Sequence, residues 1–215
     1  ILRIAPHTAG SSRDAASATR RSCTGAGKWL CVRQWRVQWR LRRWARAMVA
    51  AAAASGLPNM VGFNYVRTPA TQFVRQLLAD GAIGDVTWFR GEHTEDFLAD
   101  PAMQANWRCF GRPNGCMGDL APHMINCALA LLGDIAELSA KVETIHPTRP
   151  GPGGPVTVDN DDHGQMMVRF ASGVMGHLYF SRAATGRKMG YVYEIHGTKG
   201  AIRFDQEDQN AVWLY

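Results

Sequence analysis

The sequence predicts an α+β domain built on a large, mostly antiparallel sheet with helices on one face. Its 215 residues are 46% hydrophobic and 20% charged, which is enough apolar material for a sizeable core. Helical periodicity ends near residue 133, and short β-like runs then follow one another without a helix between them. Strands in such direct succession pair antiparallel and leave the helices to one face. No run of about 18 apolar residues occurs, which excludes an ordinary transmembrane helix.

The N-terminal part of the chain predicts one helix and one strand. Among residues 1–42, Trp35, Trp39 and the arginines beside them recur at helical spacing, which allows a basic amphipathic helix. Ala45–Ser55 is rich in alanine and is a strong helix former, and the glycine after it supplies a stop. Asn59–Asn64 is a short apolar run that predicts a strand.

Two helices and an extended segment follow. Pro69 begins an amphipathic helix that ends near Gly81, since proline favours a first helical turn and glycine a left-handed stop. Asp85–Phe97 is predicted to be extended. Asp119–Leu132 is the clearest helix, because its apolar residues form one stripe and Gly133 follows it.

The remaining elements are strands separated by Gly, Pro, Asn or Asp. Pro147–Pro155 is predicted to be a loop between strands, and His196–Gly200 a tight hairpin connection. The predicted strands are Ile135–Ile145, Val156–Val158, Gln165–Phe170, Val174–Ser181, Tyr191–His196 and Ala201–Phe204.

The net charge of +6 is a property of the N-terminal fifth of the chain. Residues 1–48 hold ten Arg and one Lys but a single acidic residue, Asp14, while the rest holds 13 basic and 17 acidic residues. Such asymmetry is typical of a basic arm that binds nucleic acid or a membrane, so this stays an alternative function. The binding constant of such an arm would fall steeply with salt.

Cysteine usage and the N-terminus favour a reduced, cytoplasmic protein. The five cysteines are an odd number without a C-x-x-C pair, which argues against a metal finger and against a disulfide framework. No pattern of a charged, then apolar, then small-residue segment is present, so no secretory signal is predicted.

The best chemical constellation is the segment from Gly118 to Asn126. Asp119 and His123 stand four residues apart, so on a helix they share a face. A carboxylate beside a histidine can hold its tautomer and raise its basicity, which suits proton exchange with a substrate hydroxyl. On spacing alone, a helix cap next to a core histidine is the more common arrangement. A metal site that recruits His93 or Cys116 has weak support, so no metal is predicted.

Other polar segments lie where a ligand could meet the loops. Asn64–Arg67 follows a predicted strand, Asn106–Arg108 combines tryptophan with arginine in a long loop, and Ser181–Lys188 is basic. Each segment has a purely structural alternative to ligand binding. It is a solvated loop for the first segment, a packed loop for the second and a solvated turn for the third. The acidic run Asp159–Asp162 predicts a polar turn, because it lacks the glycine and glutamate of a calcium loop. The candidate substrate-binding residues are Asn64, Tyr65, Arg67, Trp107, Arg108 and Arg182.

Four motifs occur in an order that resembles the glucose–fructose oxidoreductase/inositol dehydrogenase (Gfo/Idh/MocA) family, over residues 45–215. They are Met60-Val-Gly-Phe-Asn-Tyr-Val-Arg67, Leu78-Ala-Asp-Gly-Ala-Ile-Gly-Asp85, Gly118-Asp-Leu-x-x-His123 and His196-Gly-Thr-Lys-Gly-Ala-Ile-Arg-Phe204. The resemblance implies that Asp119 and His123 are the catalytic pair beside C4 of a nicotinamide. In that family they work with the lysine of a Glu-Lys-Pro motif in the preceding domain.

The N-terminal segment resembles the family only in patches. Ala5–Thr8 resembles the family's Pro-Pro-His loop, which implies cofactor contacts at Pro6 and His7. Gly27–Cys31 resembles the run before Glu-Lys-Pro, but that motif itself is missing. We hypothesise that parts of 9–44 are translated in a shifted reading frame, since their Arg-, Ala-, Ser- and Trp-rich composition is typical of misread GC-rich DNA. Translation of the source DNA in all three frames should then restore Glu-Lys-Pro.

The resemblance implies two domains and one activity. Residues 1–58 are expected to be a partial, damaged remnant of a Rossmann α/β nucleotide-binding domain, and the G-x-G-x-x-G fingerprint is absent. Residues 59–215 are expected to be a substrate-binding and oligomerisation domain that is truncated at its C-terminus. We expect the parent protein to use NAD or NADP to transfer a hydride from a hydroxyl carbon of a sugar or cyclitol.

The partners expected from the resemblance are a sugar or polyol and, through the broad sheet, further copies of the chain. No nucleic-acid or membrane partner is expected for that activity. Two alternatives remain besides the basic arm. One is a non-catalytic fragment or pseudo-enzyme, and the other is an NAD-dependent glycosidase of the same family.

Overall fold

The computed structural model describes residues 2–3 and 35–215, and the chain divides into two compact units. One unit combines Ile1–Pro6 with Phe63–Tyr215, and the other is His7–Gly62. The described helix of the second unit is α1 (Trp35–Ser55), which begins within the arginine- and tryptophan-rich segment rather than at Ala45. The sheet and the candidate site both belong to the first unit.

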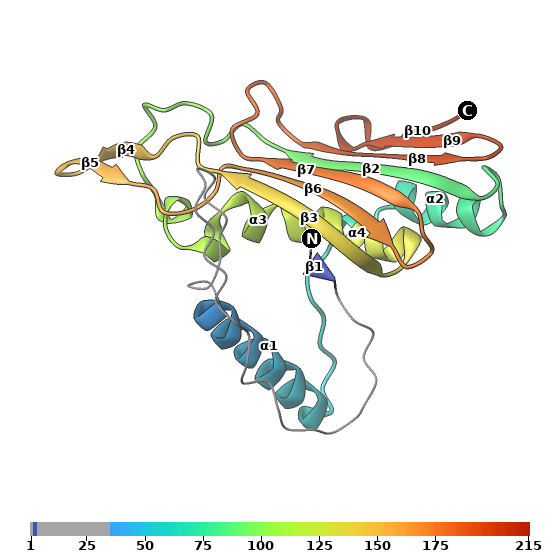
Figure 1. Cartoon of the computed structure of the whole chain (residues 1–215), viewed down its shortest axis with the longest axis horizontal. Coiled ribbons are helices and arrows are strands. Elements are labelled where there is room, and N and C mark those ends of the chain that lie inside the picture. The colour runs from blue at the N-terminus through green and yellow to red at the C-terminus, as the bar shows by residue number, and fades with distance from the viewer. Residues whose placement is uncertain (1, 4–34) are drawn as a thin grey trace. The chain divides into compact units, whose positions relative to one another are not determined.

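The first unit is built on an eight-stranded sheet with the order β1-β3-β6-β7-β2-β8-β9-β10 (Figure 1). All neighbouring strands are antiparallel except β2 and β7, which run parallel. The helices and strands that follow β2 in the chain provide the crossover that a parallel pair requires. The predicted α+β class with a mostly antiparallel sheet is confirmed. The strands are β1 (Leu2–Arg3), β2 (Val86–Thr94), β3 (Ile135–Glu143), β6 (His163–Phe170), β7 (Met175–Ser181), β8 (Gly190–Gly197), β9 (Ala201–Asp205) and β10 (Val212–Leu214).

Three helices of this unit, α2 (Pro69–Ala79), α3 (Cys116–Asp119) and α4 (Ala121–Leu132), cover one face of the sheet (Figure 1). Helix α4 approaches β2 closely because Gly91 has no side chain. A Cβ at that position would lie 2.7 Å from the sulfur of Met124. The buried core between helices and sheet therefore depends on a small residue in the middle of a central strand.

The ends of these helices follow from their sequence. The Thr68 hydroxyl accepts a hydrogen bond from the Thr71 amide, and Pro69 occupies the first turn of α2. Gly81 has φ +68 just beyond that helix, and Gly133 has φ +82 just beyond α4. None of the described helices has the length and apolar character needed to cross a membrane.

Segments 59–64 and 147–155 differ from prediction. Asn59–Asn64 forms no strand, because it lies outside every strand pairing of the described sheet, and Met60 and Val61 are exposed. The predicted loop 147–155 is mostly a small hairpin of β4 (Thr148–Gly151) and β5 (Gly154–Thr157). Pro150 and Pro155 face each other there, so the flanking residues carry the pairing, and this two-stranded sheet stays separate from the large one.

A buried arginine joins the end of β7 to the loop before α3. Arg182 is 1% exposed, and its Nε donates to the Asp162 carboxylate at 2.9 Å. Its other nitrogens donate to Asn160 Oδ1 and to the carbonyls of Arg108 and Asn114, at 2.5–2.8 Å. The charged guanidinium makes each of these hydrogen bonds strong. Arg182 therefore holds the backbone of the loop before α3 in place.

We expect Arg182→Met to lower the free energy of unfolding by about 3–5 kcal/mol, because it leaves the buried Asp162 carboxylate without its cation. Arg169→Met is the matched control, since its ion pair with Glu137 is 3.9 Å long and lies at the surface. The control should cost less than about 1 kcal/mol. Chemical denaturation measures both, and equal losses would contradict a special role for the buried pair.

Candidate active site

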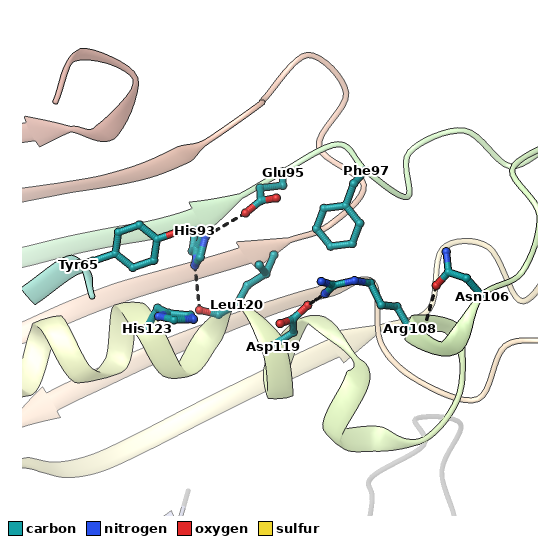
Figure 2. A pocket seen from close by; sticks show the side chains of 9 residues that line it. All are labelled: Tyr65, His93, Glu95, Phe97, Asn106, Arg108, Asp119, Leu120 and His123. Carbon is teal, nitrogen blue, oxygen red and sulfur yellow. Dashed lines mark hydrogen bonds and ion pairs between the residues drawn. The ribbon is translucent and has the colours of Figure 1, made fainter. Parts of the chain in front are cut away.

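A cavity of about 470 Å³ opens where β2 ends beside the junction of α3 and α4 (Figure 2). Its lining mixes two histidines, two carboxylates, one arginine and aromatic rings, which are the groups that bind and deprotonate hydroxyls. The lining residues are Tyr65, His93, Glu95, Phe97, Asn106, Arg108, Asp119, Leu120 and His123.

The predicted pair, Asp119 and His123, lies on two consecutive helices rather than on one. Asp119 is the last residue of α3, Leu120 forms the junction, and His123 is in the first turn of α4. The Asp119 carboxylate forms an ion pair with Arg108 (Figure 2). Within the described part of the chain, Nδ1 of His123 is buried and has no hydrogen-bond partner. The carboxylate therefore meets a guanidinium, and the histidine keeps a free ring nitrogen.

The surroundings of His123 favour its neutral form. Three rings approach it edge-on: Phe63 at 5.7 Å, Tyr65 at 5.1 Å and His93 at 5.7 Å between centroids. Burial lowers the pKa of His123, the charge of His93 lowers it further, and the charges of Asp119 and Glu95 act in the opposite direction. A neutral imidazole with an unbonded nitrogen can accept a proton from a hydroxyl.

Tyr65 forms the side of the cavity next to this histidine. Its ring stacks on Tyr191 with 4.2 Å between centroids, and its hydroxyl donates to the sulfur of Met189 at 3.4 Å. Burial raises the pKa of Tyr65, and the charges of Glu95 and Asp119 raise it further. The phenol therefore stays protonated and can donate a hydrogen bond to a ligand oxygen.

Arg108 is held on several sides. Its guanidinium lies 4.5 Å from the ring centroid of Trp107 and 5.0 Å from that of Phe97. Its backbone amide donates to Asn106 Oδ1 at 2.9 Å. Stacking between two rings leaves the guanidinium edge free to bind oxygen atoms, so Arg108 can hold both Asp119 and a ligand hydroxyl.

The structure brings together four of the predicted site residues: Tyr65, Arg108, Asp119 and His123. It places the others elsewhere. Asn64 and Arg67 are exposed at the ends of a short 3-10 turn, and neither lines the cavity. Trp107 is 63% exposed and supports Arg108 from outside, while Arg182 is buried beneath the loop and has no surface in the cavity. Pro6 and His7 lie outside the described residues.

Sequence reasoning missed the cavity roles of His93, Glu95, Phe97 and Leu120. One signal was available. His93 and Glu95 are two residues apart at the end of an extended segment, and alternate residues of a strand share a face. It could be deduced that the two side chains share a face of the sheet, but not that this is the face covered by the helices.

The acidic run Asp159–Asp162 acts as a set of local hydrogen-bond acceptors. Asp159 accepts from the Gly111 amide at 2.6 Å, and Asp161 accepts from the Met117 amide at 2.7 Å. The thiol of Cys116 donates to Asp161 at 3.1 Å, and burial raises the pKa of that thiol. Among the residues that the structure describes, no group of three or more His, Cys, Asp or Glu side chains is arranged to bind a metal ion.

Comparison with known proteins identifies the family of the chain. A family model of the GFO/IDH/MocA C-terminal domain matches residues 71–203. The chain belongs to the Gfo/Idh/MocA family. The resemblance read from its four motifs is confirmed, and the cavity of this Gfo/Idh/MocA chain contains the motif residues Asp119 and His123.

Named relatives of this Gfo/Idh/MocA chain act on sugars. Levoglucosan dehydrogenase of Pseudarthrobacter phenanthrenivorans is 37% identical over 182 residues, which are 76% of this chain and 46% of that protein. D-apiose dehydrogenase of Paraburkholderia graminis is 30% identical over 169 residues, which are 76% of this chain and 41% of that protein. The chain therefore spans less than half the length of these relatives.

Two solved structures share the fold. Levoglucosan dehydrogenase in complex with NADH and L-sorbose matches with a TM-score of 0.70 and 37% identity, over 74% of this chain and 43% of that one. An NAD binding oxidoreductase from Klebsiella pneumoniae matches with a TM-score of 0.75 and 38% identity, over 80% of this chain and 46% of that one.

We expect Asp119→Asn to lower the pKa of His123 further, because the carboxylate charge is one of the two influences that raise it. NMR titration of the imidazole measures this change. Asp85→Asn is the control, since it removes the same charge from an exposed position before β2, at the strand end remote from His93. An unchanged or raised pKa of His123 in Asp119→Asn would contradict this electrostatic assignment.

Proposed function

We propose that this chain carries the sugar-binding part of an NAD(P)-dependent dehydrogenase that oxidises a hydroxyl carbon of a sugar or polyol. The observation that carries the proposal is the cavity itself. It presents a half-buried histidine together with an aspartate that pairs with arginine, at the positions of the family motif. The named dehydrogenases that resemble the chain, which act on levoglucosan and D-apiose, support the choice of a sugar.

In this proposal four of the lining residues have distinct tasks at the sugar. His123 accepts the hydroxyl proton on its imidazole, which lines the cavity. Arg108 and Asp119 bind neighbouring oxygens and orient the ring, and the protonated Tyr65 donates to a further oxygen. Together these groups can position one hydroxyl against the base.

The charge pattern of the cavity favours a neutral substrate. Both carboxylates have cationic or proton-bearing partners, since Asp119 pairs with Arg108 and Glu95 lies 3.2 Å from Nε2 of His93. An anionic sugar would bring a third carboxylate and compete for the one arginine among the lining residues. A neutral polyhydroxylated ring needs hydrogen bonds alone, and the cavity offers both donors and acceptors.

A dinucleotide needs a pyrophosphate site in addition to this cavity. Such a site is commonly a glycine-rich turn at a helix N-terminus, and no G-x-G-x-x-G occurs in the 215 residues. When NAD or NADP is bound, it supplies the acceptor for the hydride that leaves the hydroxyl carbon. The missing fingerprint favours a second candidate function, in which the chain binds a sugar without oxidising it.

We also propose that copies of the chain associate through the sheet face opposite the helices, in the cytoplasm. Strands β6 and β7 expose Met167 and Met175 there, at 63% and 51%. Methionine side chains are flexible and polarizable, so they can contribute to an interface between subunits.

We expect levoglucosan to bind this chain with a dissociation constant in the millimolar range and Asp119→Ala to weaken that binding at least tenfold, because the sugar loses an oriented carboxylate. D-glucuronate should bind more weakly than levoglucosan. Calorimetry or ligand-observed NMR measures both. Asp85→Ala is the control variant, and it should bind like the wild type; equal affinities of all three forms would exclude this cavity as the sugar site.

Turnover separates the two candidate functions. A sugar-binding, non-catalytic chain should give no NADH or NADPH from levoglucosan, because its 215 residues contain no G-x-G-x-x-G fingerprint for the pyrophosphate. The absorbance of the reduced nicotinamide measures its formation. Binding of levoglucosan is confirmed in the same sample. NADH production that disappears in His123→Gln would instead establish the dehydrogenase.

A further inference from the structure

His93 is a buried histidine with both ring nitrogens occupied. It is 1% exposed and lies near the end of β2, and its side chain points toward the helix junction (Figure 2). Nδ1 lies 3.0 Å from the carbonyl of Leu120, and Nε2 lies 3.2 Å from Glu95 Oε1. The ring therefore spans the space between a cavity carboxylate and the backbone of the catalytic motif.

The chemistry of these two partners fixes the direction of one bond. A carbonyl oxygen can only accept, so Nδ1 must carry a proton and donate it to Leu120. Nε2 then shares a further proton with Glu95: the pair is either an imidazolium and a carboxylate, or an imidazole and a carboxylic acid. In both forms the tautomer at Nδ1 is the same, so the bond to Leu120 is preserved.

Leu120 follows Asp119 directly and lies between the two members of the predicted pair. It forms the junction between α3, which ends with Asp119, and α4, which contains His123. Its carbonyl accepts the amide of His123 at 3.3 Å as well as Nδ1 of His93. A side-chain donor at this carbonyl thus holds the turn that sets the carboxylate and the base relative to each other.

The surrounding rings restrict the movement of His93. Tyr65 lies 5.5 Å and Tyr191 5.2 Å from it, both edge-on, and the hydroxyl of Tyr191 donates to the carbonyl of His123 at 3.3 Å. The ring is therefore confined in rotation by its neighbours and in translation by its two hydrogen bonds. Such confinement is what a group that orients a reactive pair requires.

We propose that His93 is a positioning residue of the site, which acts through the Leu120 carbonyl to fix Asp119 relative to His123. The proposal rests on the proposed function for the meaning of that pair, but not for the hydrogen bond itself. His93 touches neither reacting atom, and its effect passes through the backbone turn. No other described side chain donates a hydrogen bond to this carbonyl.

Two amide substitutions separate its two bonds. The Asn side chain places its NH₂ near the former Nδ1, so His93→Asn keeps a donor for Leu120 and loses the contact with Glu95. The longer Gln side chain places its amide near the former Nε2, so His93→Gln keeps the contact with Glu95 and loses the donor. Both remove the imidazole charge, which makes each the matched control of the other.

The expected result is a difference between the two variants. His93→Gln should shift the backbone amide NMR signals of residues 119–123 and weaken levoglucosan binding roughly tenfold relative to His93→Asn. Thermal unfolding of both variants shows whether each is folded. Equal amide shifts and equal affinities in the two would overturn the proposal.

A measurement on the unaltered chain covers the case in which a variant fails to fold. Nitrogen-15 NMR of the imidazoles should find Nδ1 of His93 protonated, and an unprotonated Nδ1 would overturn the proposal. If levoglucosan binds no form of the chain, including the wild type, the proposed function fails. The amide shifts and the tautomer of His93 then still decide whether it positions the turn.

Discussion

Two carbonyl oxygens of the loop that carries Arg108 accept hydrogen bonds from one buried arginine. Arg182 collects the carbonyls of Arg108 and Asn114, while Asp162 neutralises its charge from the other side. Asp162 is itself complete, since its second oxygen accepts the amides of Ile145 and His146 at 2.8 and 3.1 Å. A buried ion pair repays its desolvation only when its remaining hydrogen bonds are filled. Here they are filled by the backbone that shapes the cavity.

The cavity then depends on two side chains that act on opposite sides of the same helix junction. Arg108, held from below, draws the Asp119 carboxylate toward the loop, and His93 holds the next carbonyl toward β2. The junction between α3 and α4 is therefore restrained from both directions. The Asp119 carboxylate points toward Arg108, and Nδ1 of His123 makes no hydrogen bond to the described residues (Figure 2).

Local rules predicted much of the fold. Proline at Pro69 and glycine at Gly133 mark helix ends through their own backbone preferences, and alternation predicted the strands. Long-range choices were out of reach. The parallel pairing of β2 with β7 depends on where a strand enters the sheet, and the strand predicted at Asn59–Asn64 does not form because it has no partner. Strand pairing is a tertiary property, so apolar residues alone do not determine it.

The contrast between local and long-range information also explains which site residues were predicted and which were missed. Asp119 and His123 are four residues apart and could be read as a unit, and Arg108 stood out beside a tryptophan. The ring of His93 reaches Leu120 across 27 positions of sequence, and Arg182 reaches Arg108 across 74. From the sequence, Arg182 is expected to be an exposed, ligand-binding residue because its loop is basic. Its carboxylate partner, Asp162, precedes β6, whereas Arg182 follows β7, so the ion pair can be recognised only in the structure. Motif spacing therefore identifies the residues that are expected to contact a substrate. The residues that position them are found only through the long-range hydrogen bonds of the structure.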